Sequence, residues 1–270
     1  MPDHLENMSR IYSERNWSLY EFLDQTLDPR GPDYLYDLAA EYVNSGSVIL
    51  DAGCRNGAHL IRLVQDHHAA GVGVDPVEAH IRQATAAVKD AGLEHRVQIR
   101  RGVMEALPYP NGHFDFVWCR DVLENVDTLQ AAMTEMARVL ALDGHMLVYT
   151  NFVTGRLEPL EARMMNRHLG NVPESLIEGH VERVFAVAGF AVVRKDLIGT
   201  EWREYAEERT QPVSQALLRL ARLRRQRSVV VERYGQETYD HVEANLHWLL
   251  YQFLGKLQPT VYLLRPRGNM

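Results

Sequence analysis

The chain has 270 residues, of which 46% are hydrophobic and 24% charged. Acidic residues number 36 against 29 Lys and Arg, so the formal net charge is −7, which argues against broad binding to nucleic acid or to an anionic membrane. No stretch approaches the roughly 20 apolar residues of a membrane span. The N-terminus lacks the apolar core of a signal peptide, and two cysteines are too few for a disulfide framework. We therefore expect a cytoplasmic protein.

Short β-rich runs alternate with helical segments between residues 47 and 150. The predicted strands are 47–52, 71–75, 96–101, 114–119 and 145–150, and the predicted helices between them are 57–68, 76–92 and 127–140. Pro76 is expected at the first helical position and Asp127 at a helix cap, and Asp143-Gly144 is expected to turn the chain into the fifth strand. Because strands and helices alternate, the sequence predicts a doubly wound α/β sheet with parallel strands and right-handed crossovers.

The flanking segments are mostly helical. Residues 5–44 are predicted to be helical with a break at 29–32, and 173–188 form a helix followed by a strand at 190–198. Residues 200–257 are helical, and 259–266 supply a last strand. We divide the chain into an N-terminal helical lid (1–45), an α/β core (46–199) with a lid insertion (151–170), a helical insertion that forms a substrate cover or oligomer interface (200–258), and a final strand with a tail (259–270).

A glycine-containing turn follows the first predicted strand. The run VILDAGCRNG (48–57) places Gly53 and Gly57 there, and glycine allows a tight turn and close backbone approach to a ligand. Asp75 ends the next strand, 18 residues after Gly57, where an acid can accept hydrogen bonds from ribose hydroxyls. This unit predicts a nucleotide site and leaves open which nucleotide binds.

Five segments, in this order, resemble the motifs of the class I S-adenosylmethionine-dependent methyltransferases, in particular their small-molecule branch. They are Asp51-x-Gly53-x-x-x-Gly57, Gly73-Val74-Asp75-Pro76, residues 101–109, 114–117 with 122–126, and 137–140 with Asp143-Gly144. The likeness covers residues 46–150, and 171–199 with 259–265 look like the usual end of the sheet. It implies a Rossmann-like, mostly parallel, seven-stranded sheet and the cofactor S-adenosyl-L-methionine, with S-adenosyl-L-homocysteine as product.

The resemblance also implies a set of cofactor-binding residues. Carried over position by position, they are Asp51, Gly53, Arg55, Gly57, Asp75, Pro76, Met104, Glu105 and Cys119. Gly53 and Gly57 would lie under the methionine part of the cofactor, and Asp75 would hold the ribose. Met104 and Glu105 would border the adenine.

Three positions depart from the family pattern. Arg55 replaces the middle glycine of the first motif and either reaches the methionine carboxylate or points to solvent. Val103 stands where an acid often contacts the adenine amine, and Asn125 where many relatives have a histidine. An alcohol or phenol acceptor usually needs a base, whereas an amine needs only to arrive deprotonated. Because the matched motifs contain no obvious base, we expect methylation of nitrogen.

The N-terminal segment is unusually aromatic. In one continuous helix, Tyr12 and Tyr20 would lie about 80° apart and could face one pocket. An N-terminal helix often closes over the cofactor in related methyltransferases, so the resemblance suggests Tyr12 and Tyr20 as catalytic residues and Trp17 as a substrate-binding one. The alternative is that these rings pack the helix onto the core.

Further candidates follow the fourth predicted strand. Arg120, Asp121 and Asn125 lie at the sheet edge where α/β proteins bind ligands, and we expect them to bind substrate; helix capping and loop hydrogen bonds are the alternative. Cys54 and Cys119 end neighbouring strands and are expected to be buried and reduced. No histidines show zinc-ligand spacing, so we predict no metal.

The sequence thus predicts a methyltransferase that acts on a small molecule, of the kind that tailors antibiotics, with an amine as first choice of acceptor and an oxygen as second. A protein of this fold that catalyses another reaction, or only binds a ligand, is a different class. An RNA methyltransferase would use the arginine run at 219–227, although the acidic stretch at 201–208 and a solvated or intersubunit face also account for it. We expect a small-molecule substrate, no nucleic-acid or membrane partner, and a homo-oligomer.

Overall fold

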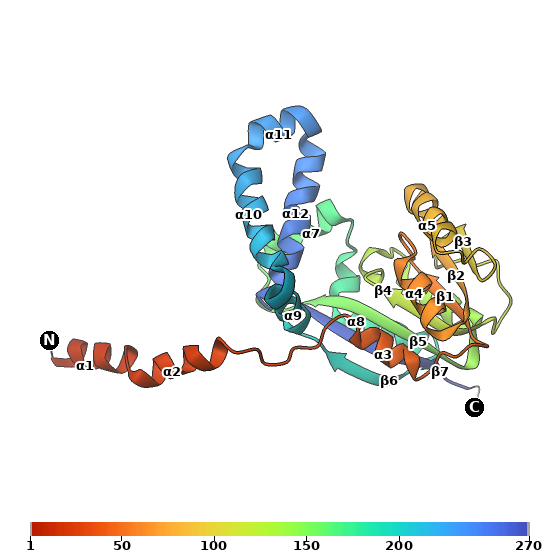
Figure 1. Ribbon diagram of the computed structural model, residues 1–270, viewed down its shortest axis with the longest axis horizontal. Helices are drawn as coiled ribbons and strands as arrows, with labels where there is room; N and C mark the ends of the chain where they lie inside the picture. The colour runs from red at the N-terminus through yellow and green to blue at the C-terminus, as the bar shows by residue number, and fades with distance from the viewer. Residues whose placement is uncertain (1, 269–270) are drawn as a thin grey trace.

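The computed structural model describes residues 2–268 and contains one seven-stranded sheet (Figure 1). Its strands are β1 (Val48–Ala52), β2 (Ala70–Asp75), β3 (Val97–Arg101), β4 (Phe114–Arg120), β5 (Leu140–Val153), β6 (Phe190–Leu197) and β7 (Leu257–Pro266). Their order across the sheet is β3-β2-β1-β4-β5-β7-β6, and only β7 runs antiparallel to its neighbours β5 and β6. The predicted doubly wound, mostly parallel architecture is confirmed.

Helices cover both faces of the sheet. The α-helices are α1 (Pro2–Ile11), α2 (Glu14–Leu23), α3 (Tyr34–Ala40), α4 (Ala58–His67), α5 (Glu78–Asp90), α6 (Leu129–Val139), α7 (Pro159–Leu169), α8 (Glu178–Val187), α9 (Glu201–Thr210), α10 (Pro212–Arg225), α11 (Arg227–Tyr234) and α12 (Gln236–Phe253). Two short 3-10 turns, η1 (Leu123–Asn125) and η2 (Pro173–Leu176), follow β4 and α7. Helices α6 and α8 pack on one face, and α3, α4 and α5 on the other.

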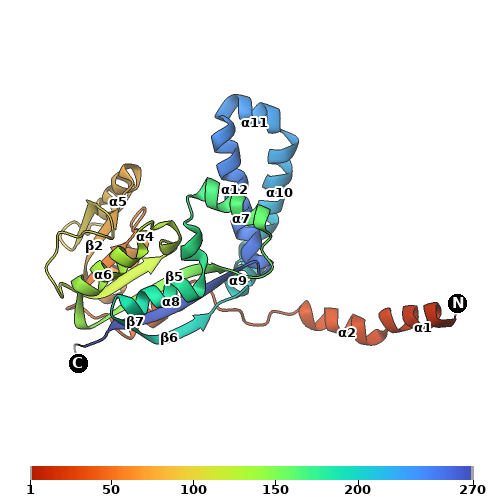
Figure 2. The ribbon, with the colours of Figure 1, turned by 180° about the vertical axis from the view of Figure 1, so that it is seen from behind.

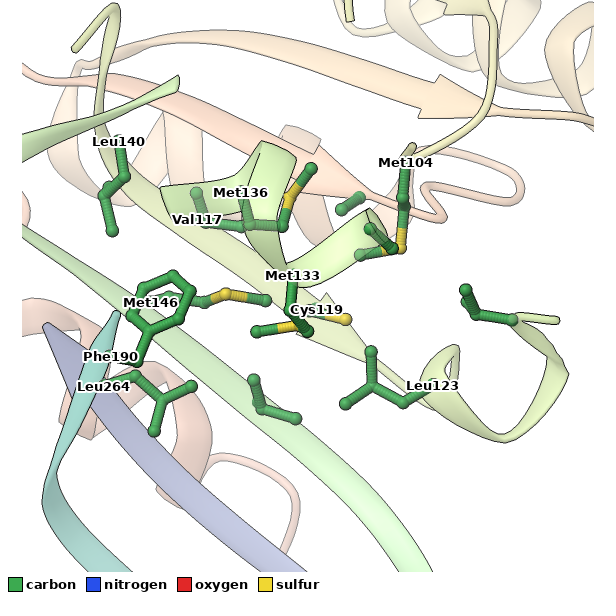
Figure 3. Packing of buried hydrophobic residues seen from close by; sticks show 14 of the residues in the cluster. Met104, Val117, Cys119, Leu123, Met133, Met136, Leu140, Met146, Phe190 and Leu264 are labelled. Atoms are coloured by element: carbon green, nitrogen blue, oxygen red, sulfur yellow. The ribbon is translucent and has the colours of Figure 1, made fainter. Parts of the chain in front are cut away.

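The central strand β4 shows why the sheet is buried on both sides. Phe116 and Trp118 pack into the hydrophobic cluster on one face, whereas Val117 and Cys119 pack into the cluster on the other. A parallel strand covered by helices on both faces is apolar throughout rather than alternating with polar residues. Figure 3 shows Val117 and Cys119 beside the methionines of α6, where flexible thioether side chains fill the core.

Two expected helix starts were one or two residues early. Helix α5 begins at Glu78 with Val77 as its N-cap, so Pro76 lies before the helix rather than at its first position. Helix α6 begins at Leu129 with Thr128 as its N-cap, in place of Asp127. Both differences are small because a capping residue and its neighbour are hard to distinguish without the backbone angles.

The prediction that Asp143-Gly144 turns the chain was wrong. Helix α6 ends at Val139 and β5 begins at once, so both residues lie inside a strand of 14 residues. The pairing of β4 with β5 shifts register between Phe114 and Phe116, opposite this segment. A Cβ on Gly144 would lie 2.8 Å from the Asp115 carbonyl oxygen, so glycine is needed for close strand approach rather than for a turn. Strand β5 also continues to Val153, into the segment expected to form a lid.

The outer part of the helical insertion projects away from the sheet. Helices α10, α11 and α12 project together from α9 in both views (Figures 1 and 2). They hold one another through an apolar cluster of their own, centred on Val213, Leu220 and Leu250. Arg224 of the arginine run pairs with Glu243 of α12 at 2.9 Å. Within the described chain, no acid of the 201–208 stretch forms an ion pair with this run.

The N-terminal segment forms two helices instead of one. Helix α1 ends at Ile11 and α2 begins at Glu14, so Tyr12 lies in the break and the predicted angle between Tyr12 and Tyr20 on a single helix was wrong. Both helices extend away from the core (Figure 2). Arg30 anchors the base of this segment through an ion pair with Glu201 of α9 at 2.6 Å. Within residues 2–268, no helix combines the length and apolar character that crossing a bilayer requires.

Candidate functional site

The turn between β1 and α4 is built by glycine. Gly53 and Gly57 have φ angles of +83° and +77°, which L side chains rarely adopt. The amides of Gly53 and Cys54 donate to the Val74 carbonyl oxygen at 2.8 and 3.0 Å, so the turn folds over the end of β2. A Cβ on Gly53 would overlap the Val122 side chain. The sequence therefore brings bare backbone to the carboxyl edge of the sheet.

Arg55 occupies the same turn in a left-handed conformation. Its φ of +47° costs a non-glycine residue roughly 1–2 kcal/mol, which explains why glycine suits this position. The Arg55 amide donates to Oδ2 of Asp75 at 3.0 Å. The Arg55 side chain is exposed and lines the cleft described below. Arg55 in place of glycine thus adds a side chain at the edge of the cleft, while the backbone of the turn keeps its left-handed conformation.

Asp75 and Asp51 are buried carboxylates at the ends of β2 and β1. Asp75 also accepts the Val77 amide at 2.9 Å, and Nδ1 of His80 lies 3.0 Å from its Oδ1. Asp51 keeps one carboxylate oxygen without a hydrogen-bond partner among the described residues. Burial, with a smaller contribution from the Asp75 charge, raises the pKa of Asp51 to about 7. An unsatisfied buried acceptor of this kind fits the amino group of a ligand.

These turns open into a cleft of about 790 Å³ at the carboxyl ends of β1, β2 and β4. The site lies where open α/β sheets bind ligands. The lining residues are Gly53, Cys54, Arg55, Asn56, Ala58, His59, Asp75, Pro76, Val77, His80, Arg120, Asp121, Val122, Asn125, Leu169 and His241. The last two come from α7 and α12, so the helical insertion forms part of the wall.

A histidine and an arginine occupy one end of this cleft. Nδ1 of His59 lies 2.5 Å from the Tyr36 hydroxyl oxygen, and Nη1 of Arg120 lies 3.3 Å from Nε2. Because a guanidinium only donates, Nε2 must accept and the neutral ring carries its proton on Nδ1. Burial, together with the charges of Arg120 and other arginines, lowers the pKa of His59 to about 4. The imidazole is therefore neutral at physiological pH.

A chain of buried hydrogen bonds links the sheet edge to the helical insertion. The Asn151 amide nitrogen Nδ2 donates to Glu124 at 3.0 Å and to Asp121 at 3.1 Å. Gln252 of α12 donates to the Asn151 side-chain oxygen at 2.6 Å and accepts from Nε of Arg203 at 2.5 Å. Such a network specifies one arrangement of α9 and α12 over the sheet because breaking it would leave buried polar groups unpaired.

Glu124 is the buried acid of this network. Its side chain is 2% exposed, and one carboxyl oxygen accepts both the Asn151 backbone and side-chain N–H groups, while the other has no partner among the described residues. Burial first, and then the charge of Asp121, raises the pKa of Glu124 to about 7.

The structure brings some of the predicted site residues together and leaves others apart. Gly53, Arg55, Asp75, Pro76, Arg120, Asp121 and Asn125 line the cleft. Asp51, Gly57 and Cys119 are buried behind it. Asn125 also donates to the carbonyl oxygens of Leu169 and Gly170 at 2.9 and 3.0 Å, which holds the loop after α7. The loop hydrogen bonds given as the alternative for Asn125 are therefore present.

Met104 and Glu105 do not line this cleft. Met104 is 6% exposed and packs in the core, and Glu105 borders a neighbouring cavity of about 870 Å³ near α6 and α8. The aromatic candidates lie further away on the N-terminal helices. Tyr12, Trp17 and Tyr20 are 63%, 60% and 62% exposed. In this structure none of these five residues contacts the cleft.

Sequence reasoning missed several residues of the site. His59, His80, Arg203 and Glu124 were not singled out. A signal existed for His59, because it precedes the core residue Leu63 by four positions and thus shares its helical face. No comparable signal existed for Arg203, since its place depends on how the helical insertion packs. Within residues 2–268, no group of three or more His, Cys, Asp or Glu side chains is arranged to hold a metal ion.

The segment that builds this cleft is similar to a known protein family. Residues 50–148 match a family described as a methyltransferase domain. These residues are therefore similar to a methyltransferase domain. The match contains the turn after β1 and the Asp75 carboxylate, which are the parts of the cleft that S-adenosylmethionine would require. The bare backbone at Gly53, the acid that ends β2 and the unpaired oxygen of Asp51 fit the methionine and ribose parts of that cofactor.

The individual relatives match a stretch of similar length. The uncharacterized methyltransferase YcgJ of Bacillus subtilis is 29% identical over 104 residues, and 27-O-demethylrifamycin SV methyltransferase of Amycolatopsis mediterranei is 28% identical over 104 residues. Each match covers 38% of this chain, and 40% and 38% of those proteins. Among solved structures, the cyclase SpnF superposes with a TM-score of 0.68 at 20% identity over 87% of this chain and 82% of its own. The chain therefore matches less than half the length of these curated relatives, while its fold extends over most of the solved structure.

The raised pKa of Glu124 predicts that stability depends on pH. In the unfolded chain this carboxyl titrates near 4.5, whereas in the folded protein it keeps its proton up to about 7. Between these values the folded protein binds more protons, so the free energy of unfolding falls as pH rises, by up to about 3 kcal/mol from this group. Asp51 contributes in the same direction. We expect Glu124→Gln to remove the Glu124 part of that fall.

Denaturant unfolding of the wild type and Glu124→Gln at pH 5 and pH 8 measures this effect. The exposed Glu94→Gln is a matched control, because it removes one carboxylate without touching the network. We expect the difference in stability between the two pH values to shrink in Glu124→Gln and to stay unchanged in Glu94→Gln. Equal pH dependence of Glu124→Gln and the wild type would contradict the raised pKa.

The position of Asp75 predicts how the cleft binds its cofactor. Asp75→Asn replaces one acceptor oxygen by an N–H donor, so the side chain can no longer serve the Arg55 amide, the Val77 amide and a ribose hydroxyl together. We expect the affinity for S-adenosylhomocysteine to fall by about 10-fold to 100-fold, as for a lost hydrogen bond to a charged group. Calorimetric titration measures it, with the exposed Asp90→Asn as the control and thermal unfolding as the test of folding. Unchanged affinity in folded Asp75→Asn would remove Asp75 from the cofactor site.

Proposed function

We propose that this protein transfers a methyl group from S-adenosylmethionine to a small molecule, with an amine nitrogen as the acceptor. The observation that carries the proposal is the turn after β1, joined to Asp75 at the end of β2 and opening into the 790 Å³ cleft. The matched methyltransferase domain covers this same turn. The cofactor, when bound, supplies the electrophilic methyl group of a sulfonium.

The residues of the chain would do the work of alignment. Backbone at Gly53 and the carboxylate of Asp51 would receive the methionine part, and Asp75 would receive the ribose hydroxyls. Holding the acceptor lone pair in line with the methyl group can account for roughly 7–11 kcal/mol of the barrier. Asp121 extends into the cleft with its side chain 48% exposed, where it can pair with an amine.

The choice of nitrogen rests on the groups beside the acceptor space. Asn125 is engaged with loop carbonyl oxygens, and the lowered pKa of His59 makes that imidazole a weak base. Neither group is suited to remove the proton of an alcohol, whereas an amine can arrive deprotonated. Oxygen acceptors remain the second candidate, since a relative that the chain resembles is named for the methylation of a demethylrifamycin oxygen.

An acceptor screen tests the reaction. We expect transfer of label from methyl-labelled S-adenosylmethionine to members of an amine panel, rising with pH as each amine loses its proton, and at least ten times less transfer to matched alcohols. Mass spectrometry of the product locates the new methyl group. Transfer to oxygen only would show that the acceptor atom is oxygen and not nitrogen. Tight cofactor binding without transfer to any acceptor would favour a binding protein, or an enzyme of this fold with another reaction.

We also propose that residues 1–45 serve as a lid, with the insertions at 151–170 and 200–258 as further parts of the cover. Large apolar side chains on α1 and α2 are exposed, among them Trp17, Leu19, Tyr20 and Phe22 at 53–62%. They lie all round α2 rather than on one face, and helices of ten residues are marginal without a packing partner. Closure over the cleft would bury them and bring Tyr12, Trp17 and Tyr20 to the acceptor. For residues 200–258 we propose a second possible role, as the interface of a homo-oligomer.

Limited proteolysis tests the lid. Trypsin sites at Arg10 and Arg15 lie on the exposed N-terminal helices, and the exposed Lys89 on α5, outside the proposed cover, is the internal control. We expect saturating S-adenosylhomocysteine to slow cleavage at Arg10 and Arg15 at least ten-fold and to leave Lys89 unaffected, because closure buries the first two sites. Equal rates at all three sites with and without ligand would argue against closure.

A further inference from the structure

One charged side chain of the cleft has a fixed position and an unused hydrogen-bonding edge. The Arg120 guanidinium lies beside the Tyr149 and Trp202 rings, at 5.7 and 5.5 Å from their centroids. The two rings stack on one another at 4.3 Å with an angle of 10°. The side chain of Arg120 is 21% exposed and lines the cleft. The Arg120 side chain is thus already ordered in the free protein, so a ligand that binds it does not have to supply the conformational entropy cost of ordering it.

The polar contacts of Arg120 use only part of its donor capacity. Nη1 meets the neutral His59 ring at 3.3 Å, and Nε meets Asp121 at 3.5 Å. A guanidinium has five N–H donors in a planar fork, and no partner of Nη2 is found among the described residues. The fork that suits a carboxylate is therefore open on one edge.

A second guanidinium lies near this end of the cleft. Arg203 belongs to the same surroundings, because it is linked to Asp121 through Gln252 and Asn151. Arg120 also acts on the buried Asp51, and Glu124 lies near Asp121, so acids and guanidinium groups share this end of the cleft. A bound carboxylate would give the open edge of Arg120 a partner of opposite charge.

We propose that Arg120 is the carboxylate-binding residue of this cleft, and that the ligand presents a carboxylate to its open edge. His59 and the aromatic pair position the guanidinium, and Arg203 adds positive potential behind it. The carboxylate can come from the methionine part of the cofactor or from the acceptor. The inference rests on the proposed function for the identity of the cofactor, while the anion site itself rests on the geometry of Arg120.

Two titrations distinguish these sources. The first compares S-adenosylhomocysteine with its carboxamide analogue, which lacks only the carboxylate charge. The second adds acetate and benzoate, or the neutral acetamide and benzamide, to protein saturated with S-adenosylhomocysteine. Both use the wild type, Arg120→Gln, Arg120→Lys and Arg222→Gln. Arg222 is an exposed arginine of α10 outside the cleft and serves as the matched control. Thermal unfolding shows that each variant is folded.

Either source gives a distinct pattern. If the cofactor supplies the carboxylate, Arg120→Gln weakens S-adenosylhomocysteine at least ten-fold, leaves the carboxamide unchanged, and Arg120→Lys recovers part of the loss because it keeps a charge without the fork. If the acceptor supplies it, S-adenosylhomocysteine binds all variants equally. In that case the carboxylate probes bind the wild type and Arg222→Gln at least ten-fold more tightly than their amides, and Arg120→Gln abolishes the difference.

The inference is overturned if Arg120→Gln changes neither the preference for S-adenosylhomocysteine over its carboxamide nor the binding of the carboxylate probes. Failure of the proposed function has a different signature, since the wild type would then bind neither S-adenosylhomocysteine nor the carboxamide. The carboxylate probes are in that case titrated into the protein without cofactor, and their dependence on Arg120 still decides the anion site.

Discussion

The hydrogen bonds of the Asp75 carboxylate hold the ligand cleft together. This side chain accepts the Arg55 amide from the turn after β1 and the Val77 amide from the turn after β2. It therefore joins two crossover turns that are separate in the chain and fixes the backbone that faces the ligand. A left-handed Arg55 is tolerated there because its amide gains a charged partner. Both the floor and the rim of the cleft depend on this one carboxylate.

Polar side chains also decide where the helical insertion lies. Asn151 sits at the carboxyl half of β5, and its amide group contacts Glu124 and Asp121 on one side and Gln252 on the other. An apolar contact would let α12 slide, whereas a buried amide has specific donors and acceptors to satisfy. The network thus sets the distance between the sheet and the insertion, and it places Arg203 and Asp121 beside the cleft.

The sequence predicted the central α/β part well because the signals there are local. Strands β1, β2 and β4 are short, largely apolar runs, and β1 to β4 all end at their predicted positions within one or two residues. Gly53, Gly57 and Asp75 occupy the turn and strand end that were expected. Asp143-Gly144 misled because the same pair serves a turn or a bulge. Only the approach of Asp115 across the sheet shows that Gly144 is needed for contact between strands.

The sequence by itself determined where the strands and helices of the α/β core follow one another along the chain. It also determined the glycine turn and the acid that follows it, since each of these features depends on residues close together in the chain. The tertiary structure alone decided that Arg120 meets His59 and the stacked rings of Tyr149 and Trp202, and that Arg203 reaches the network through Gln252. Arg120 and Trp202 lie 82 positions apart in the chain, and Arg203 and Gln252 lie 49 apart, and no periodicity in the sequence encodes such contacts. The side of the cleft formed by the glycine turn and Asp75 is thus a local property of the chain, and the side formed by Arg120 is a property of how the helical insertion packs.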